Sequence, residues 1–189
     1  MPFGLFRRKS RDAEHRVYSQ IVAQARQPVF YQGYFVPDTI DARFDMIVVH
    51  TVLLFRRFKG AERSAGTFAQ NVFDLFFADM DANLREIGIA DVRVPKKIGK
   101  MAEAFYGRAD AYIPLIDAND EKALAQALER NIWPEDETAE TSTATQSEPL
   151  ALARYMIGAA AALEAQDTRT ICEGSVNFPD GADYLGQDR

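Results

Sequence analysis

ARFDMIVVHTVLLFRRFKG, residues 42–60, is the stretch that decides the fold. Its apolar stripe repeats at helical spacing through Phe44, Ile47, Val48, Thr51, Leu54, Phe55 and Phe58. Further valines lie on the opposite side, and basic residues in the last turn meet the negative end of the helix dipole. Gly60 is a typical stop. We therefore predict a helix over about 41–58 that is central in the domain.

A second long helix is predicted from about Ser64 or Thr67 to Ile87. One face of it carries Phe68, Val72, Leu75, Phe76, Met80, Asn83 and Leu84. Gly88 supplies a left-handed position at its end. The tract GIADVRVP that follows is partly β-like in composition and predicts an extended connector.

Pro95 predicts the start of a third helix, because proline suits the first turn. Gly107 is expected to interrupt this helix, and Pro114 is expected to kink or end it. A further helix follows, with Asp117 or Asn119 as its N-cap. Its apolar repeat is Leu124, Leu128 and Ile132.

Residues 134–149, PEDETAETSTATQSEP, have no large apolar side chain and are acidic and rich in threonine. This composition predicts a mobile linker or a long surface loop. Residues 150–166 then predict a last helix, with small residues that permit close packing on the core. The turn-rich tail up to residue 189 is expected to be only partly ordered.

Working back from the central helix, residues 27–39 (QPVFYQGYFVPDT) form an aromatic connector. Its four aromatic side chains are expected either to pack on the core or to form an exposed patch for a partner: Phe30, Tyr31, Tyr34 and Phe35. Residues 12–26 predict a helix. Residues 1–11 predict a flexible basic arm, with a weak contact to anionic lipid as the alternative.

These elements predict an all-α fold: a single compact bundle of five or six helices with an acidic flexible linker before the last helix. Residues 12–133 would form the core of the bundle. The C-terminal helix and tail, 150–189, would pack against it.

The composition fits this prediction. The chain has 189 residues, of which 47% are apolar and 26% are charged, as in ordinary globular proteins. A net charge of −6 argues against a DNA-binding protein. A single cysteine excludes an internal disulfide and fits a reducing compartment. Since no window reaches the roughly 20 apolar residues of a membrane span, and no signal peptide is visible, we expect a cytoplasmic protein.

The residues that usually carry chemistry are few and scattered. His15 and His50 lie on separate predicted helices, without a second ligand at metal-binding spacing. His50, inside MIVVHTVLLF, is expected to be mostly buried with one hydrogen bond; a haem ligand is the alternative. Cys172 has no histidine near it in sequence. We therefore predict no catalytic residue, no metal site and no cofactor.

One dense basic patch stands out in the body of this acidic chain. Lys96, Lys97 and Lys100 are close in sequence to Arg85 and Arg93. Such a patch is commonly a solvated face. It is also a candidate docking surface for ribosomal RNA, anionic lipid or an acidic partner.

Four stretches together resemble the ubiquinol–cytochrome c chaperone family. They are YSQIVAQARQPVFYQGYFVPDT (18–39), ARFDMIVVHTVLLFRRFKG (42–60), FAQNVFDLFFADMDANLREIGIADVRVPKKIGKMAEAFYGR (68–108) and AYIPLI (111–116). The most specific part is FADMDANLREIG followed by VPKKIGKMAEAFYGR. Residues 117–189 match only loosely.

The resemblance implies a function. Eukaryotic members of this family resemble mitochondrial assembly factors that handle newly made cytochrome b, act with a small partner protein and contact the mitochondrial ribosome. This chain looks like the bacterial form. The resemblance therefore implies a non-catalytic assembly factor or chaperone of the respiratory chain. It would bind cytochrome b or another bc1 precursor as a peripheral protein at the inner face of the cytoplasmic membrane.

The resemblance names no contact residues, so the candidates come from the residues themselves. Besides the aromatic connector, Phe73 and Phe77 could supply apolar surface for a membrane-protein client. Arg43, Asp45 and Arg85 could orient it, together with the lysine patch. Two other functions are kept open. One is a helical protein that binds haem or a small apolar ligand through His50 or another donor such as Tyr106, and the other is a ribosome-associated factor that docks through the lysines.

Overall fold

The computed structural model describes residues 3–134 and 147–186. Every regular element in these ranges is helical, which confirms the all-α bundle. The elements are α1 (Phe3–Ala25), α2 (Pro28–Gln32), α3 (Ile40–Phe58), α4 (Arg63–Glu86), α5 (Val94–Asp117), α6 (Glu121–Ile132), α7 (Ser147–Glu164), α8 (Thr168–Cys172) and the 3₁₀ turn η1 (Gly181–Tyr184).

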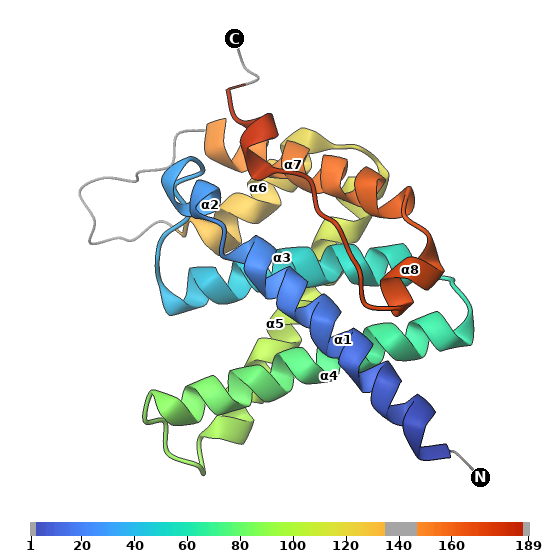
Figure 1. Ribbon diagram of the computed structural model, residues 1–189. Helices are drawn as coiled ribbons and strands as arrows, with labels where there is room; N and C mark the ends of the chain where they lie inside the picture. The colour runs from blue at the N-terminus through green and yellow to red at the C-terminus, as the bar shows by residue number, and fades with distance from the viewer. Residues whose placement is uncertain (1–2, 135–146, 187–189) are drawn as a thin grey trace.

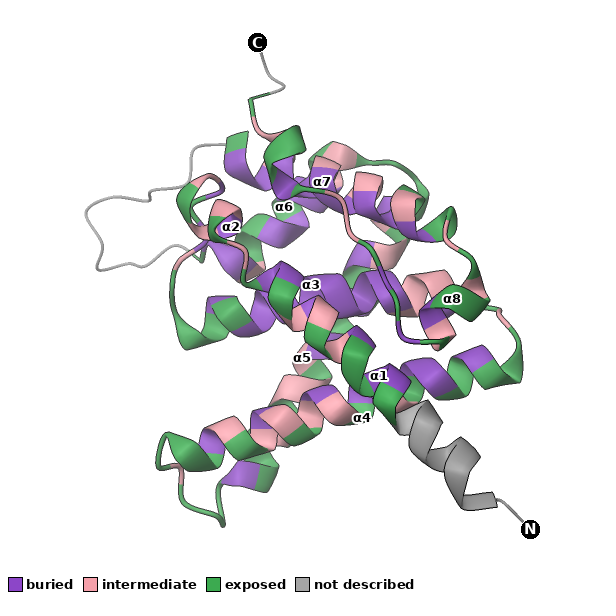
Figure 2. Ribbon diagram, in the orientation of Figure 1, coloured by how far each residue is buried: buried purple, intermediate pink, exposed green. Residues whose placement is uncertain are grey.

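The helix α3 is the centre of the molecule, as its sequence predicts. It contacts α1, α4, α5, α6 and α7, and its residues 44–54 are all buried (Figure 2). The Thr39 hydroxyl caps its start by accepting a hydrogen bond from the Ala42 amide (3.2 Å). Gly60, at φ +77°, lies in the turn that follows. A helix that is apolar on most of its circumference is thus covered on all sides.

The helices α4 and α5 form a long antiparallel hairpin. Figure 1 shows its far end projecting away from the rest of the bundle, at the lower left. Near the bundle the two helices pack against α3, through an aromatic cluster that includes Phe73 and Phe105. The hairpin therefore has one end inside the core and one end in solvent.

The predicted breaks in α5 are wrong, because the helix continues through Gly107 and Pro114 to Asp117. Pro114 lies on the exposed side of the last turn, where water can satisfy the carbonyl left without a donor. Asn119 then takes a left-handed conformation (φ +51°). Asp120, rather than either predicted residue, caps α6 by accepting from the Ala123 amide (3.0 Å).

The structure describes the two ends of the chain as far as Phe3 and Gly186. The helix α1 begins at Phe3, where we expected a flexible arm up to residue 11. The C-terminal tail is held along the bundle as far as η1, and for example the Tyr34 hydroxyl donates to the Gly181 carbonyl (2.6 Å). Residues 135–146, which form most of the predicted acidic linker, lie outside the described residues.

Candidate partner-binding surface

His50 is fully buried and belongs to a polar cluster inside the bundle. Its Nδ1 lies 2.7 Å from the Met46 carbonyl, one turn earlier in α3, and its Nε2 lies 2.8 Å from the Tyr155 hydroxyl in α7. A carbonyl only accepts, so Nδ1 carries the proton and Nε2 accepts from Tyr155. The Tyr155 hydroxyl in turn accepts from the Gln24 amide of α1 (3.0 Å). One histidine thus joins three helices.

This arrangement keeps the imidazole neutral. Burial lowers the pKa of His50 to about 4, against a smaller opposing effect of the Met46 carbonyl. The prediction of a buried histidine is correct, but it has two hydrogen bonds rather than one. Since both ring nitrogens are engaged, His50 has no free nitrogen to offer a haem iron in this conformation.

Asp45 and Arg43, two candidates on α3, have different surroundings. Asp45 is buried and forms an ion pair with Arg108 of α5 (2.8 Å), whose guanidinium also lies 5.9 Å from the centre of the Phe44 ring. Burial raises the pKa of Asp45 to about 7, although Arg108 opposes this shift. Arg43 is exposed and paired with Asp38 (2.5 Å). The structure therefore leaves Arg43 accessible and makes Asp45 part of the interior.

The aromatic connector likewise contains both buried and exposed residues. Phe30 and Tyr34 are fully buried core residues, and Tyr31 is half-buried with its hydroxyl on the Ala25 carbonyl (3.1 Å). Phe35 is the exposed member, with 53% of its surface accessible. Its φ of +51° costs a non-glycine residue roughly 1–2 kcal/mol. The Trp133 indole, which donates to the Phe35 carbonyl (3.0 Å), helps hold this conformation.

A second exposed aromatic site lies on the α4–α5 hairpin, close to the bundle. We call Phe73, Phe77 and Tyr106 the aromatic ledge. The Phe73 ring centre is 4.6 Å from that of Phe77 and 5.7 Å from that of Tyr106. Phe73 is buried against Phe105 of the core, Phe77 is half-buried, and Tyr106 is 52% exposed. The ledge thus joins exposed aromatic surface to rigid core packing.

The basic patch lies at the far end of the same hairpin. We call residues 85–100 the hairpin tip. Lys96, Lys97 and Lys100 are all exposed, in the first turns of α5. Arg85 is paired with Asp81 (2.6 Å) and Asp91 (2.5 Å), so it links α4 to the connecting loop.

The structure therefore brings the candidates together at two places rather than one. The α4–α5 hairpin carries the aromatic ledge and the basic patch, whereas the α2–α3 loop carries Phe35 and Arg43. Figure 1 shows α2 and the hairpin tip at different ends of the molecule. The residues that sequence reasoning missed are tertiary partners, namely Arg108 and Tyr155, and the exposed Val92 of the tip. Only Val92 left a sequence signal, as a valine between Asp91 and Arg93.

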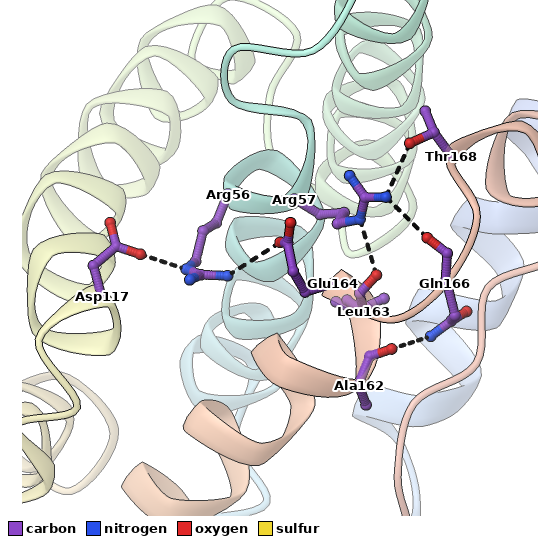
Figure 3. Close-up of polar contacts among 8 residues, drawn as sticks. All are labelled: Arg56, Arg57, Asp117, Ala162, Leu163, Glu164, Gln166 and Thr168. Atoms are coloured by element: carbon purple, nitrogen blue, oxygen red, sulfur yellow. Dashed lines mark hydrogen bonds and ion pairs between the residues drawn. The ribbon is translucent and has the colours of Figure 1, made fainter.

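A shallow groove of about 450 Å³ lies among the C-terminal ends of α3, α5 and α7. Arg56 crosses it, at 2.7 Å from Asp117 and 3.8 Å from Glu164 (Figure 3). The neighbouring Arg57 turns toward the end of α7 and donates to the carbonyls of Leu163 (2.9 Å) and Gln166 (2.8 Å). Arg57 thus satisfies carbonyls that the end of a helix leaves without partners. These contacts give the two arginines structural roles.

The remaining reactive groups do not form a site. Within residues 3–134 and 147–186, no three His, Cys, Asp or Glu side chains are placed to hold a metal ion. Cys172 is half-buried, and burial raises the pKa of its thiol, which disfavours the nucleophilic thiolate. Across the same described ranges, no helix is both long and apolar enough to cross a bilayer.

The fold and these surfaces define an all-helical protein that presents aromatic and basic side chains on a projecting hairpin. The chain belongs to the ubiquinol-cytochrome C chaperone family, which matches residues 32–178. It is similar to a solved structure, that of the Cbp3 homolog from Brucella abortus. The two are 38% identical with a TM-score of 0.83, over 96% of this chain and 98% of the other.

A curated relative is more distant. It is ubiquinol-cytochrome-c reductase complex assembly factor 1 from Xenopus laevis, which is 25% identical over 124 residues. The match covers 66% of this chain and 62% of the relative. The chain therefore spans less than two thirds of that protein.

Proposed function

We propose that this protein is a non-catalytic assembly factor that binds newly made cytochrome b, or another precursor of the cytochrome bc1 complex. Its membership of a chaperone family supports the general role. The name of the Xenopus relative, an assembly factor of the ubiquinol-cytochrome-c reductase complex, supports the choice of client. The protein would act where such a client enters the membrane.

The observation that carries the proposal is the aromatic ledge. A chaperone for a membrane protein needs apolar surface that a client can cover and leave again. Tyr106 offers an exposed ring whose hydroxyl tolerates water, so the ledge can be open without a client. Phe73, packed beneath it, fixes its position and so limits the entropy lost on binding. The ledge would act as a hot spot, a small group of residues that supplies most of the binding energy.

The experiment is affinity purification of the tagged full-length protein from its native membranes, in wild-type and variant forms. Tyr106→Ser removes the exposed ring of the ledge. Phe35→Asn is the matched control, because the two rings are similarly exposed (52% and 53%) and lie on different elements, Tyr106 in α5 and Phe35 in the α2–α3 loop. Asparagine also tolerates the left-handed backbone at position 35.

We expect wild type and Phe35→Asn to recover cytochrome b or other bc1 subunits, and Tyr106→Ser to recover at least tenfold less. A strain without the gene should also lose assembled bc1 complex, measured by its haem absorbance in membranes. Loss of capture with Phe35→Asn alone would move the client site to the α2–α3 loop. An unchanged bc1 level in the deletion strain would refute the proposed function.

A further inference from the structure

Two apolar residues that flank the loop of the hairpin are buried outside the main core. Leu84 of α4 and Val94 of α5 are buried, yet neither belongs to the main core cluster. Gly88, at φ +85°, ends α4, and the Ile89 amide donates back to the Leu84 carbonyl (3.0 Å). Together with the pairs that Arg85 makes to Asp81 and the loop, these contacts hold the tip in one shape.

This rigid tip exposes aliphatic side chains at its extremity. Val92 is 86% exposed and Ile87 is 55% exposed, and both lie in the loop that Figure 2 shows as almost entirely exposed. The buried apolar residues beside this loop are Leu84 and Val94 instead. The structure therefore holds two aliphatic side chains in water at the most projecting end of the hairpin.

These two side chains lie in a segment that is rich in positive charge. Residues 85–100 contain five basic and two acidic residues in a chain whose net charge is −6. One of the two acids, Asp91, is already paired with Arg85. In the part of the chain that the structure describes, no ion pair involves Arg93, Lys96, Lys97 or Lys100. The tip thus offers exposed cations to an external anion.

We propose that the hairpin tip docks on the surface of an anionic lipid bilayer, with Val92 and Ile87 entering the headgroup region and the four cations contacting lipid phosphates. Exposed aliphatic side chains in the same segment as several cations suit the boundary between headgroups and acyl chains. Single-stranded nucleic acid is instead bound by basic grooves with stacking aromatics. The tip has no aromatic residue between 85 and 100. Charge and side-chain type therefore both favour lipid.

The proposal does not depend on the identity of the client. If it is correct, Tyr106 lies six residues beyond Lys100, the last cation of the contact, which corresponds to about 9 Å of α5. The ledge and the tip are then separate surfaces of one hairpin. Changes at one should leave the other functional, so the two proposals fail independently.

The test is cosedimentation of the full-length protein with vesicles of phosphatidylcholine alone or with 30% phosphatidylglycerol. We expect binding to the anionic vesicles that weakens with salt. Each cation near such a surface contributes roughly fivefold, so Lys96→Gln/Lys97→Gln/Lys100→Gln should weaken binding on the order of 100-fold. Lys59→Gln/Lys122→Gln, on exposed lysines outside the tip, should bind as wild type does.

A label separates the tip from residues 1–11, whose basic and aromatic composition could itself attract lipid. The single cysteine permits this, since Cys172→Ser leaves no other thiol. A polarity-sensitive fluorophore on Val92→Cys should brighten with anionic vesicles, whereas the same label on Ile40→Cys, which is also exposed, should not. An unchanged signal at Val92, equal binding to neutral vesicles, or salt-sensitive binding to ribosomes without vesicle binding would each overturn the proposal.

Discussion

Acidification should destabilise this protein through His50. The unfolded chain binds a proton at the ordinary histidine pKa of 6.5, whereas the folded protein resists protonation until about 4. The stability from this group is therefore fully present above pH 6.5 and is lost as the pH falls toward 4. The linkage relation gives a loss of about 2 kcal/mol between pH 8 and pH 5, and about 3 kcal/mol below pH 4.

The assay is urea unfolding at pH 8 and pH 5, followed by the fluorescence of Trp133. This is the only tryptophan of the sequence, and it is buried in the folded protein. The carboxyl group of Asp45, with its pKa of about 7, also titrates in this range, so the comparison is with His50→Gln, which keeps Asp45. Between pH 8 and pH 5, His50→Gln should lose about 2 kcal/mol less unfolding free energy than the wild type loses. His15→Gln, at the exposed histidine, is the control for the substitution itself.

An equal pH dependence in wild type and His50→Gln would refute the reasoning, because it would mean that folded and unfolded chains protonate His50 alike. A second measurement covers the case in which the variant does not fold. The imidazole NMR signals of wild-type His50 should stay at their neutral position down to pH 5. A shift near pH 6.5 would show that the buried ring is not held neutral.

Other predictions concern single contacts. Gly158→Ala should lower the free energy of unfolding by about 1–3 kcal/mol, measured in urea, because its methyl group would collide with the Tyr184 ring; equal stability would show that the tail moves aside freely. Arg57→Ala should lower the free energy of unfolding by about 1–3 kcal/mol and speed hydrogen exchange at the end of α7. Arg56→Ala should lower it by under about 1 kcal/mol, because the ion pairs of Arg56 are more exposed. A larger loss for Arg56→Ala than for Arg57→Ala would contradict the capping role of Arg57. The protonated carboxyl of Asp45 stabilises the fold at low pH, and this stability is lost as the pH rises through about 7, so Asp45→Asn should remove it. In urea unfolding, the difference in unfolding free energy between pH 5 and pH 8 should change on the order of 2 kcal/mol in the variant. No change would mean that the carboxyl is ionised throughout.

The central helix could be predicted because its apolar pattern fits only a helix that is buried on most sides. A stripe of seven residues at helical spacing, with more apolar residues behind it, must be covered by other helices wherever they come from. The ends of elements were harder. Pro114 looked like a break, yet the last turn of a helix tolerates a proline that faces water. Asp117 and Asn119 were the predicted caps of α6, but Asp117 still belongs to α5 and Asn119 takes a left-handed backbone, so Asp120 is the residue that caps the helix.

The candidate surface could be predicted only in part, because exposure is a tertiary property. The four aromatic residues of the connector look alike in sequence, but Phe30 and Tyr34 are buried while Phe35 faces solvent. Whether these side chains are buried depends on contacts with η1 and α7, which lie more than a hundred residues away in the sequence. Asp45 looked like a surface charge until Arg108, on a helix far along the chain, was placed beside it. The lysines were easier, because long charged side chains seldom become buried.

The C-terminal tail, which packs along the bundle, affects the order in which the chain can fold during its synthesis. In the first helix, Gln20 accepts from the Val176 amide (2.7 Å) and Gln24 donates to the Pro179 carbonyl (3.0 Å). Gln20 and Gln24 therefore leave the ribosome more than 150 residues before the segment that completes their bonds. Until that segment emerges, the surface between them stays open, and the ring of Phe30 lacks the cover of Gly181. A protein proposed to bind newly made chains would thus pass through an incomplete state of its own during synthesis.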